Sequence, residues 1–185
     1  MKGTGDNMNP DTNSFESGMY FDRAEAETAV DRLHGLGYAQ DDISVMMDDK
    51  TREQAFAGQV GAKTTEGVAT GAVAGGLLGM MVAGAITAGG AAVVVGTGGV
   101  ATPFILGPIW AALAGLGIGG ATGGVLGGLI GLGVGEQRAK QYEQGLREGG
   151  ILIAVRPKSG HADSVREALR DKYSTDVAGE VASIR

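Results

Sequence analysis

The chain has 185 residues, of which 35 are glycine and none is cysteine, and its formal net charge is −6. The absence of cysteine excludes a disulfide framework, a thiolate metal site and a cysteine nucleophile. The acidic balance argues against general nucleic-acid binding, because that binding depends on Lys and Arg neutralising phosphates.

The N-terminal part of the chain predicts a tail and then half of an α/β domain. Residues 1–16 are polar, contain Gly, Asn and Pro, and have no continuous apolar segment of the kind a signal peptide needs, so we expect a mobile tail. Residues 17–65 are predicted to supply the first half of the α/β domain and a linker. Within them, residues 17–22 (SGMYFD) form a strand candidate, and residues 43–47 alternate as a half-buried strand.

A helix is predicted between these two strands. Asp22 and Glu25 have the spacing of a capping box, and Gly35 and Gly37 end the pattern. The helix places four apolar residues on one face: Ala26, Ala29, Val30 and Leu33.

The middle of the chain, residues 66–135, is apolar and rich in glycine. No Asp, Glu, Lys, Arg or His occurs between Glu66 and Glu136, and turn signals from Pro103, Pro108 and several glycines divide the segment into two apolar runs. Glycine recurs at every fourth position in both runs: Gly67, Gly71, Gly75 and Gly79, then Gly115, Gly119, Gly123, Gly127, Gly131 and Gly135.

This glycine spacing needs an explanation, because glycine disfavours an exposed helix by about 0.8–1.0 kcal/mol relative to alanine. A flexible linker would carry polar residues between the glycines, whereas here they are Leu, Ile, Val and Ala. Lipid enforces helix formation, and small residues at this spacing allow close helix packing. Each run has about the 20 residues that a bilayer span needs. We therefore predict a glycine-zipper helical hairpin that makes either two full crossings or a re-entrant wedge, with Trp110 either at the far membrane interface or simply packed.

Residues 136–185 are predicted to supply the second half of the α/β domain. A helix over residues 136–148 places Ala139, Tyr142 and Leu146 on one face, and residues 151–157 form a strand buried on both faces. A second helix is predicted to bury Ala162, Val165, Leu169 and Tyr173, and a weak strand follows near residues 176–181. Together the two halves predict an α+β fold, a ferredoxin-like split βαβ domain interrupted by the apolar hairpin.

Patterns typical of catalysis or cofactor binding are weak in this chain. Residues 93–101 and 115–120 imitate dinucleotide-binding glycine loops, yet no acidic residue follows at the required distance. His34 and His161 have no evident carboxylate partner, and the paired aspartates around residues 41–49 lack EF-hand spacing. We therefore expect no enzyme activity, no cofactor, no metal, no nucleic acid and no small-molecule substrate.

Several segments also resemble a known family. Phe21-Asp22, Gly37-Tyr38, residues 42–45 (DISV), Tyr142-Glu143 and residues 149–152 (GGIL) are similar to those of the bacterial general stress protein family, heat-induced and YflT-type. The resemblance implies a stress-induced protein with a small α/β domain and a glycine-rich apolar insert, and it implies no catalytic residues.

These observations predict a membrane-associated general stress protein. The hairpin would insert in or pack at the cytoplasmic membrane and self-associate, while the α/β domain faces the cytoplasm as an interaction module, in agreement with Lys63, Arg138, Lys140 and Arg147 flanking the hairpin. The lipid bilayer and further copies of the chain are the expected partners. The alternative is a soluble homo-oligomeric shell or filament that buries the glycine-zipper helices between subunits.

Overall fold

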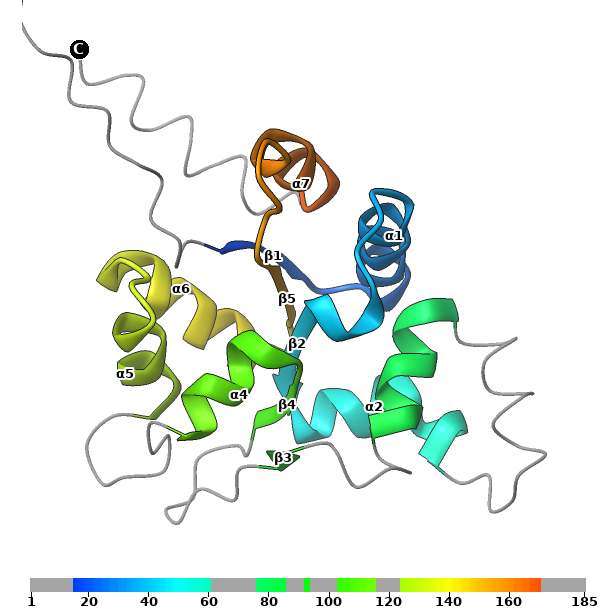
Figure 1. Cartoon of the computed structure of the whole chain (residues 1–185). Coiled ribbons are helices and arrows are strands. Elements are labelled where there is room, and N and C mark those ends of the chain that lie inside the picture. The colour runs from blue at the N-terminus through cyan, green and yellow to red at the C-terminus, as the bar shows by residue number, and fades with distance from the viewer. Residues whose placement is uncertain (1–14, 61–75, 86–91, 94–102, 116–123, 171–185) are drawn as a thin grey trace, which may run out of the picture.

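The computed structural model describes residues 15–60, 76–85, 92–93, 103–115 and 124–170, and the structural statements below refer to these residues. They form three layers, in which an antiparallel sheet lies between two layers of helices (Figure 1). The strand order is β1 (Glu16–Tyr20), β5 (Ile151–Val155), β2 (Ile43–Asp48), β4 (Pro103–Leu106) and β3 (Ala92–Val93). The first four strands form the body of the sheet, and β3 adds two residues at its edge.

Strand β5 lies at the centre of the main sheet. It pairs antiparallel with β1 on one side, where Tyr20 is opposite Ile151, and with β2 on the other, where Met47 is also opposite Ile151. All five residues of β5 are buried, as the sequence predicts for a strand covered on both faces. Strands β1 and β2 are therefore parallel to each other, with β5 between them.

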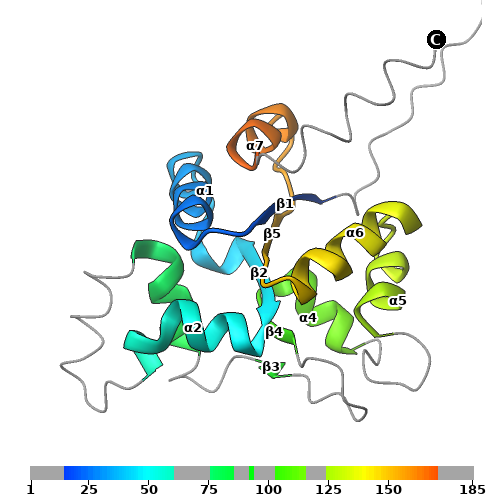
Figure 2. The same ribbon diagram turned by 180° about the vertical axis from the view of Figure 1, so that it is seen from behind.

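One face of the sheet is covered by helices from three parts of the sequence: α1 (Arg23–Gly35), α2 (Asp49–Val60), a helix over residues 76–85, and α7 (Ala162–Ala168). Figure 2 shows α1, α2 and α7 on the same side of the sheet, seen from behind. Alternate strand residues such as Val45 and Ile153 face this layer and join Leu33 of α1 and Val82 of the helix over residues 76–85 in one buried cluster.

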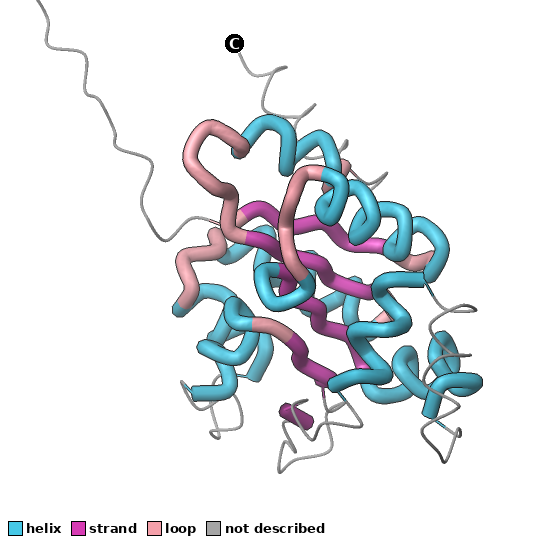
Figure 3. Tube along the Cα trace, turned by 45° about the vertical axis from the view of Figure 1, so that its right-hand side comes forward, coloured by secondary structure: helices cyan, strands magenta, loops and turns pink. Residues whose placement is uncertain are grey.

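The opposite face is covered by α4 (Pro108–Gly115), α5 (Gly124–Gly131) and α6 (Glu136–Arg147). Figure 3 shows helices on both sides of the sheet strands. The remaining strand residues, such as Met46 and Leu152, pack here with Trp110 of α4 and Leu129 of α5. Strands β1, β5, β2 and β4 thus each contribute to two cores, because neighbouring side chains along a strand point to opposite faces.

The predicted elements of the outer segments are largely confirmed. Asp22 caps α1, and its side chain accepts hydrogen bonds from the backbone N–H groups of Ala24 at 2.8 Å and Glu25 at 3.1 Å. The four residues predicted for the inner face of α1 are all buried. Helix α6 buries Ala139 and Leu146 as predicted.

Three details of the outer segments differ from the prediction. Strand β2 was expected to be half-buried, but Met46 is buried as well, because α4 and α6 cover its second face. Ala162 is exposed rather than buried, since α7 begins there and only its later residues reach the core. Helix α2 was not predicted, because its sequence lacks an apolar stripe; Phe56 is buried in the core, and Ala55 packs against that core.

The described part of the apolar middle segment differs from the predicted hairpin. Residues 76–85 pack on one face of the sheet, whereas α4 and α5 pack on the other. The segment expected to be a turn contains β4, which pairs with β2 so that Val45 lies opposite Leu106. Helices α4 and α5 also contact each other over the same face, so the second run folds back instead of continuing in one direction.

The prediction of transmembrane helices is accordingly not supported. Within the described residues, every helix is too short, or insufficiently apolar, to traverse a bilayer. Helices α4 and α5 have eight residues each, whereas a span needs about 20. The apolar side chains expected to face lipid are instead used in part to cover both faces of the sheet.

The fold class is α+β with an antiparallel sheet, and its finer ferredoxin-like description is not confirmed. The order β1-β5-β2 has the arrangement of a split βαβ unit, in which α1 connects two parallel strands with a third between them. The expected last strand near residues 176–181 lies outside the described residues. At the other edge, β4 extends the sheet beyond β2 with residues that the prediction assigned to a loop.

Candidate functional site

The predicted glycine-zipper residues are separated by the sheet. Gly79 lies in the helix over residues 76–85 on one face, and Gly127 and Gly131 lie in α5 on the other. Gly115 is the last residue of α4. Five further positions fall outside the described residues: Gly67, Gly71, Gly75, Gly119 and Gly123.

Gly79 is buried against α1 of the same chain. Its backbone N–H donates a hydrogen bond to the carboxylate of Glu27 at 3.3 Å. The Glu27 carboxylate is also 3.4 Å from the guanidinium of Arg23, which in turn donates to the carbonyl of Ala55 in α2 at 2.6 Å. Gly79 therefore takes part in a contact within the same chain, where the helix over residues 76–85 meets α1 and α2.

Gly127 and Gly131 of α5 face outward instead. A Cβ added at Gly127 or Gly131 would meet no atom within 4 Å, and the same holds for Gly135 at the N-cap of α6. Ile130, between the two α5 glycines, is 43% exposed. We call the surface formed by Gly127, Ile130 and Gly131 the α5 outer face. It carries no charge, and its glycines leave room for close approach of another helix.

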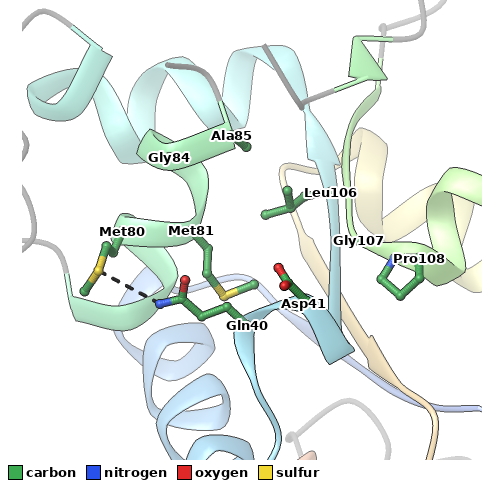
Figure 4. A pocket seen from close by; sticks show the side chains of 9 residues that line it. All are labelled: Gln40, Asp41, Met80, Met81, Gly84, Ala85, Leu106, Gly107 and Pro108. Atoms are coloured by element: carbon green, nitrogen blue, oxygen red, sulfur yellow. Dashed lines mark hydrogen bonds between the residues drawn. The ribbon is translucent and has the colours of Figure 1, made fainter. Parts of the chain in front are cut away.

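A cavity of about 380 Å³ opens between the helix over residues 76–85, the 3-10 turn η1 (Gln40–Asp42) and the loop that joins β4 to α4 (Figure 4). The thioethers of Met80 and Met81 and the side chain of Leu106 give it apolar walls. Asp41 and Gln40 supply its polar groups, and the Gln40 amide nitrogen donates to the sulfur of Met80 at 3.9 Å. Sequence reasoning missed this site, because its two sides are 40 residues apart and neither contains a recognised motif.

A second cavity, of about 560 Å³, lies between the start of β1 and the junction of α5 with α6. Phe15, Ser17 and Arg138 line it, together with the backbone between Leu132 and Gly135. Ser17 and Tyr142 share a hydrogen bond of 2.8 Å between their hydroxyl groups. The cavity combines an aromatic ring with a guanidinium, but its other charged side chain, Glu136, offsets that positive charge.

Two ion pairs shift pKa values on the surface of the helices. A hydrogen bond from the Lys140 ammonium at 2.6 Å, and then the charge of the same group, lower the pKa of the Glu136 carboxyl. A hydrogen bond to the Glu16 carboxylate at 2.6 Å raises the pKa of the Arg166 guanidinium. The second pair ties α7 to β1, and neither pair resembles a proton-transferring site.

Trp110 is packed rather than placed at a surface. Its side chain is fully buried, and its ring meets that of Phe15 edge to face, with centroids 5.5 Å apart. Its indole N–H has no hydrogen-bond partner among the described residues. Of the two roles that the sequence left open for Trp110, the structure supports packing. The described residues also contain no group of three or more His, Cys, Asp or Glu side chains able to hold a metal.

The fold and these surfaces define a mixed α+β domain whose apolar middle segment contributes to both faces of an antiparallel sheet. Residues 16–93 match the family model described as the heat induced stress protein YflT domain. This match supports the resemblance to the bacterial general stress protein family over residues 16–93, whereas Tyr142-Glu143 and residues 149–152 lie beyond it. No curated protein and no solved structure matches this sequence.

The match ends at Val93, before β4 and β5. The matched residues thus include β1 and β2, while the strand between them comes from the later part of the chain. The family match supports a general stress function.

Proposed function

We propose that this chain is a non-enzymatic stress protein that acts by self-association, with the α5 outer face as its contact surface. The observation that carries this proposal is the open space outside Gly127 and Gly131, next to the exposed side chain of Ile130. In the resulting oligomer, the α/β domains of neighbouring copies lie close together and serve as interaction modules.

The α5 outer face is suited to contact a second copy of itself. In a two-fold symmetric contact, the same surface is used by both subunits. The Ile130 side chain of one copy would fill the space outside Gly127 and Gly131 of the other, and no charge would have to be desolvated. Burying apolar area contributes about 25 cal/mol per Å², so such a contact gains stability without polar partners.

The test is the mass of the full chain in solution, measured by light scattering after size exclusion, for the protein and for Gly127→Leu and Gly131→Leu. We expect the unchanged chain to form oligomers and both variants to shift toward monomer, because leucine fills the space that Ile130 of the partner needs. The variants remain folded, since replacing an exposed helical glycine by leucine favours the helix by about 0.8 kcal/mol.

The matched control is Gly35→Leu. Gly35 ends α1 on the opposite face of the sheet, and a Cβ there also meets no atom within 4 Å. This variant should retain the oligomer. A monomeric unchanged chain, or equal oligomers in all four proteins, would contradict the proposed contact.

A second candidate function is packing of the same surface against the cytoplasmic side of the cytoplasmic membrane. It is favoured by the complete lack of charged residues between Glu66 and Glu136, together with the exposure of Ala111, Ala112 and Ile130 on α4 and α5. An uncharged apolar surface of this kind is typical of membrane or protein contact sites.

Fractionation of the native host with an alkaline carbonate wash separates the two candidates. Release from the membranes by the wash, with flotation of the purified chain on vesicles of neutral lipid, would support surface packing. Retention after the wash would indicate insertion of segments outside the described residues. Recovery as a lipid-free particle would leave self-association as the function of the α5 outer face.

A further inference from the structure

We propose that Met80 is a site of reversible methionine oxidation, at which the chain reacts with hydroperoxides. This inference is independent of the α5 outer face, which lies on the other side of the sheet from Met80. It rests on the exposure of Met80, on its hydrogen bond to Gln40 and on the lack of cysteine in the whole chain.

The sulfur chemistry of this protein is restricted to methionine. The sequence has seven Met and no Cys, so oxidation of sulfur by two electrons can occur only at a thioether. Oxidation of methionine gives the sulfoxide, which methionine sulfoxide reductases convert back, so the change is reversible.

Among the methionines of the described residues, Met80 is the exposed one. It is 39% exposed, whereas the neighbouring Met81 is 6% exposed. Three others lie in the two cores and are almost fully buried: Met19, Met46 and Met47. Since oxidation follows access to the oxidant, the fold exposes one of these five described thioethers and protects the other four.

The surroundings of Met80 also contain a hydrogen-bond donor that can bind the methionine sulfoxide formed by oxidation. The Gln40 side-chain amide donates to the Met80 sulfur at 3.9 Å, and both residues line the 380 Å³ cavity (Figure 4). Thioether sulfur is a weak acceptor, whereas the oxygen of a sulfoxide is a polar acceptor. The same N–H donor would therefore bind the oxidised side chain more strongly than the reduced one.

The reaction balances with a hydroperoxide as the only co-reactant. The Met80 sulfur attacks the distal oxygen of R–O–O–H, the O–O bond breaks and an S–O bond forms. The proton on the transferred oxygen passes to the departing R–O⁻, which leaves as the alcohol, or as water when the oxidant is hydrogen peroxide. Sulfur loses two electrons and the peroxide gains them.

Oxidation at Met80 would change the cavity that it lines. A flexible apolar wall becomes a polar one, in a cavity that the carboxylate of Asp41 also lines. The helix over residues 76–85 would also be tied more firmly to η1 through Gln40. The cavity would then favour polar ligands in the oxidised form and apolar ligands in the reduced form.

The experiment treats the full folded chain with a graded series of hydrogen peroxide concentrations and locates the added oxygen by peptide mass spectrometry. Trypsin is unsuitable, because no Lys or Arg occurs between Lys63 and Arg138, so chymotrypsin is used. Fragment ions between Met80 and Met81 distinguish the two neighbours. We expect Met80 to react about six times faster than Met81, in the ratio of their exposed fractions, 39% and 6%.

Two variants and one spectroscopic signal complete the test. Met80→Leu should abolish the fast oxidation within the helix over residues 76–85, and the matched control Met81→Leu should retain it. In the unchanged chain, the NMR signals of the Gln40 side-chain amide should move on oxidation and return after treatment with a methionine sulfoxide reductase. In Met80→Leu they should not move.

The inference is overturned by equal oxidation rates at Met80 and Met81 in the folded chain. It is also overturned if the Gln40 amide signals stay in place while Met80 is fully oxidised. A denatured sample, in which Met80 and Met81 should react at equal rates, shows that the selectivity in the native chain comes from the fold.

Discussion

The carboxylate of Glu27, on α1, accepts a hydrogen bond from the backbone N–H of Gly79 at 3.3 Å, across 52 residues of sequence. This contact joins the first predicted helix of the outer domain to the apolar middle segment. It is the point at which a segment expected to leave the domain is instead held against it.

We expect Glu27→Ala to lower the free energy of unfolding by about 1–3 kcal/mol, because a buried N–H donor at Gly79 loses its charged partner and Arg23 loses its ion pair. Chemical denaturation measures this change. Asp31→Ala, at an exposed position of the same helix, is the matched control and should change stability by less than about 0.5 kcal/mol. Equal effects of the two variants would show that the Glu27 contact contributes nothing.

Ser44 caps α4 from inside the sheet. Its buried hydroxyl accepts a hydrogen bond from the backbone N–H of Ile109 at 3.0 Å, in the first turn of that helix. We expect Ser44→Ala to destabilise the chain by about 1–2 kcal/mol, as for the loss of a helix cap. Thermal unfolding checks this, with the exposed Ser164→Ala as control; an unchanged melting temperature for Ser44→Ala would refute the role.

Gly107 allows β4 to turn directly into α4. Its φ is +92°, and an added Cβ would approach the carbonyl oxygen of Ile43 and lie 2.6 Å from the Cα of Ser44. We expect Gly107→Ala to cost more than about 2 kcal/mol, because steric overlap adds to the backbone strain. Gly160→Ala, with φ +78° and open space around the Cβ, isolates the strain and should cost about 1 kcal/mol. Similar losses of stability in Gly107→Ala and Gly160→Ala would show that steric overlap with Ile43 and Ser44 adds nothing to the backbone strain.

The pair of Glu136 and Lys140 gives a prediction for pH. Because the Lys140 ammonium lowers the pKa of the Glu136 carboxyl, any stability from the pair is present above the unfolded pKa and is lost as pH falls through the folded pKa. An NMR titration of the Glu136 carboxyl should show a pKa below its usual range. Lys140→Gln should return that pKa toward the usual range. A pKa that is the same in both proteins would exclude the ion pair as the cause.

The outer elements could be predicted from sequence because their signals are local. Asp22 and the apolar stripe of α1 follow the rules of caps and helix periodicity, and the continuous apolar run of β5 indicates a strand buried on both faces. The family resemblance rests on the same local features and is confirmed over residues 16–93.

The apolar middle could not be interpreted correctly from its own residues. Its lack of charge and its glycine spacing suit a bilayer, a helix contact or a protein core equally well, because all three are apolar surroundings. Only the pairing of β4 with β2 shows that this segment extends the sheet and covers it. The cavity beside Met80 was also not predictable, because Gln40 and Met80 meet only in the folded chain.

The sequence by itself determined the α+β class, the cap and inner face of α1, the central burial of β5 and the resemblance to the stress protein family over residues 16–93. The tertiary structure decided where the described parts of the apolar runs lie and that Gly79 faces inward while Gly127 and Gly131 face outward. The physical reason is that caps and periodicity depend on residues a few positions apart, whereas strand pairing and side-chain exposure depend on partners distant in sequence.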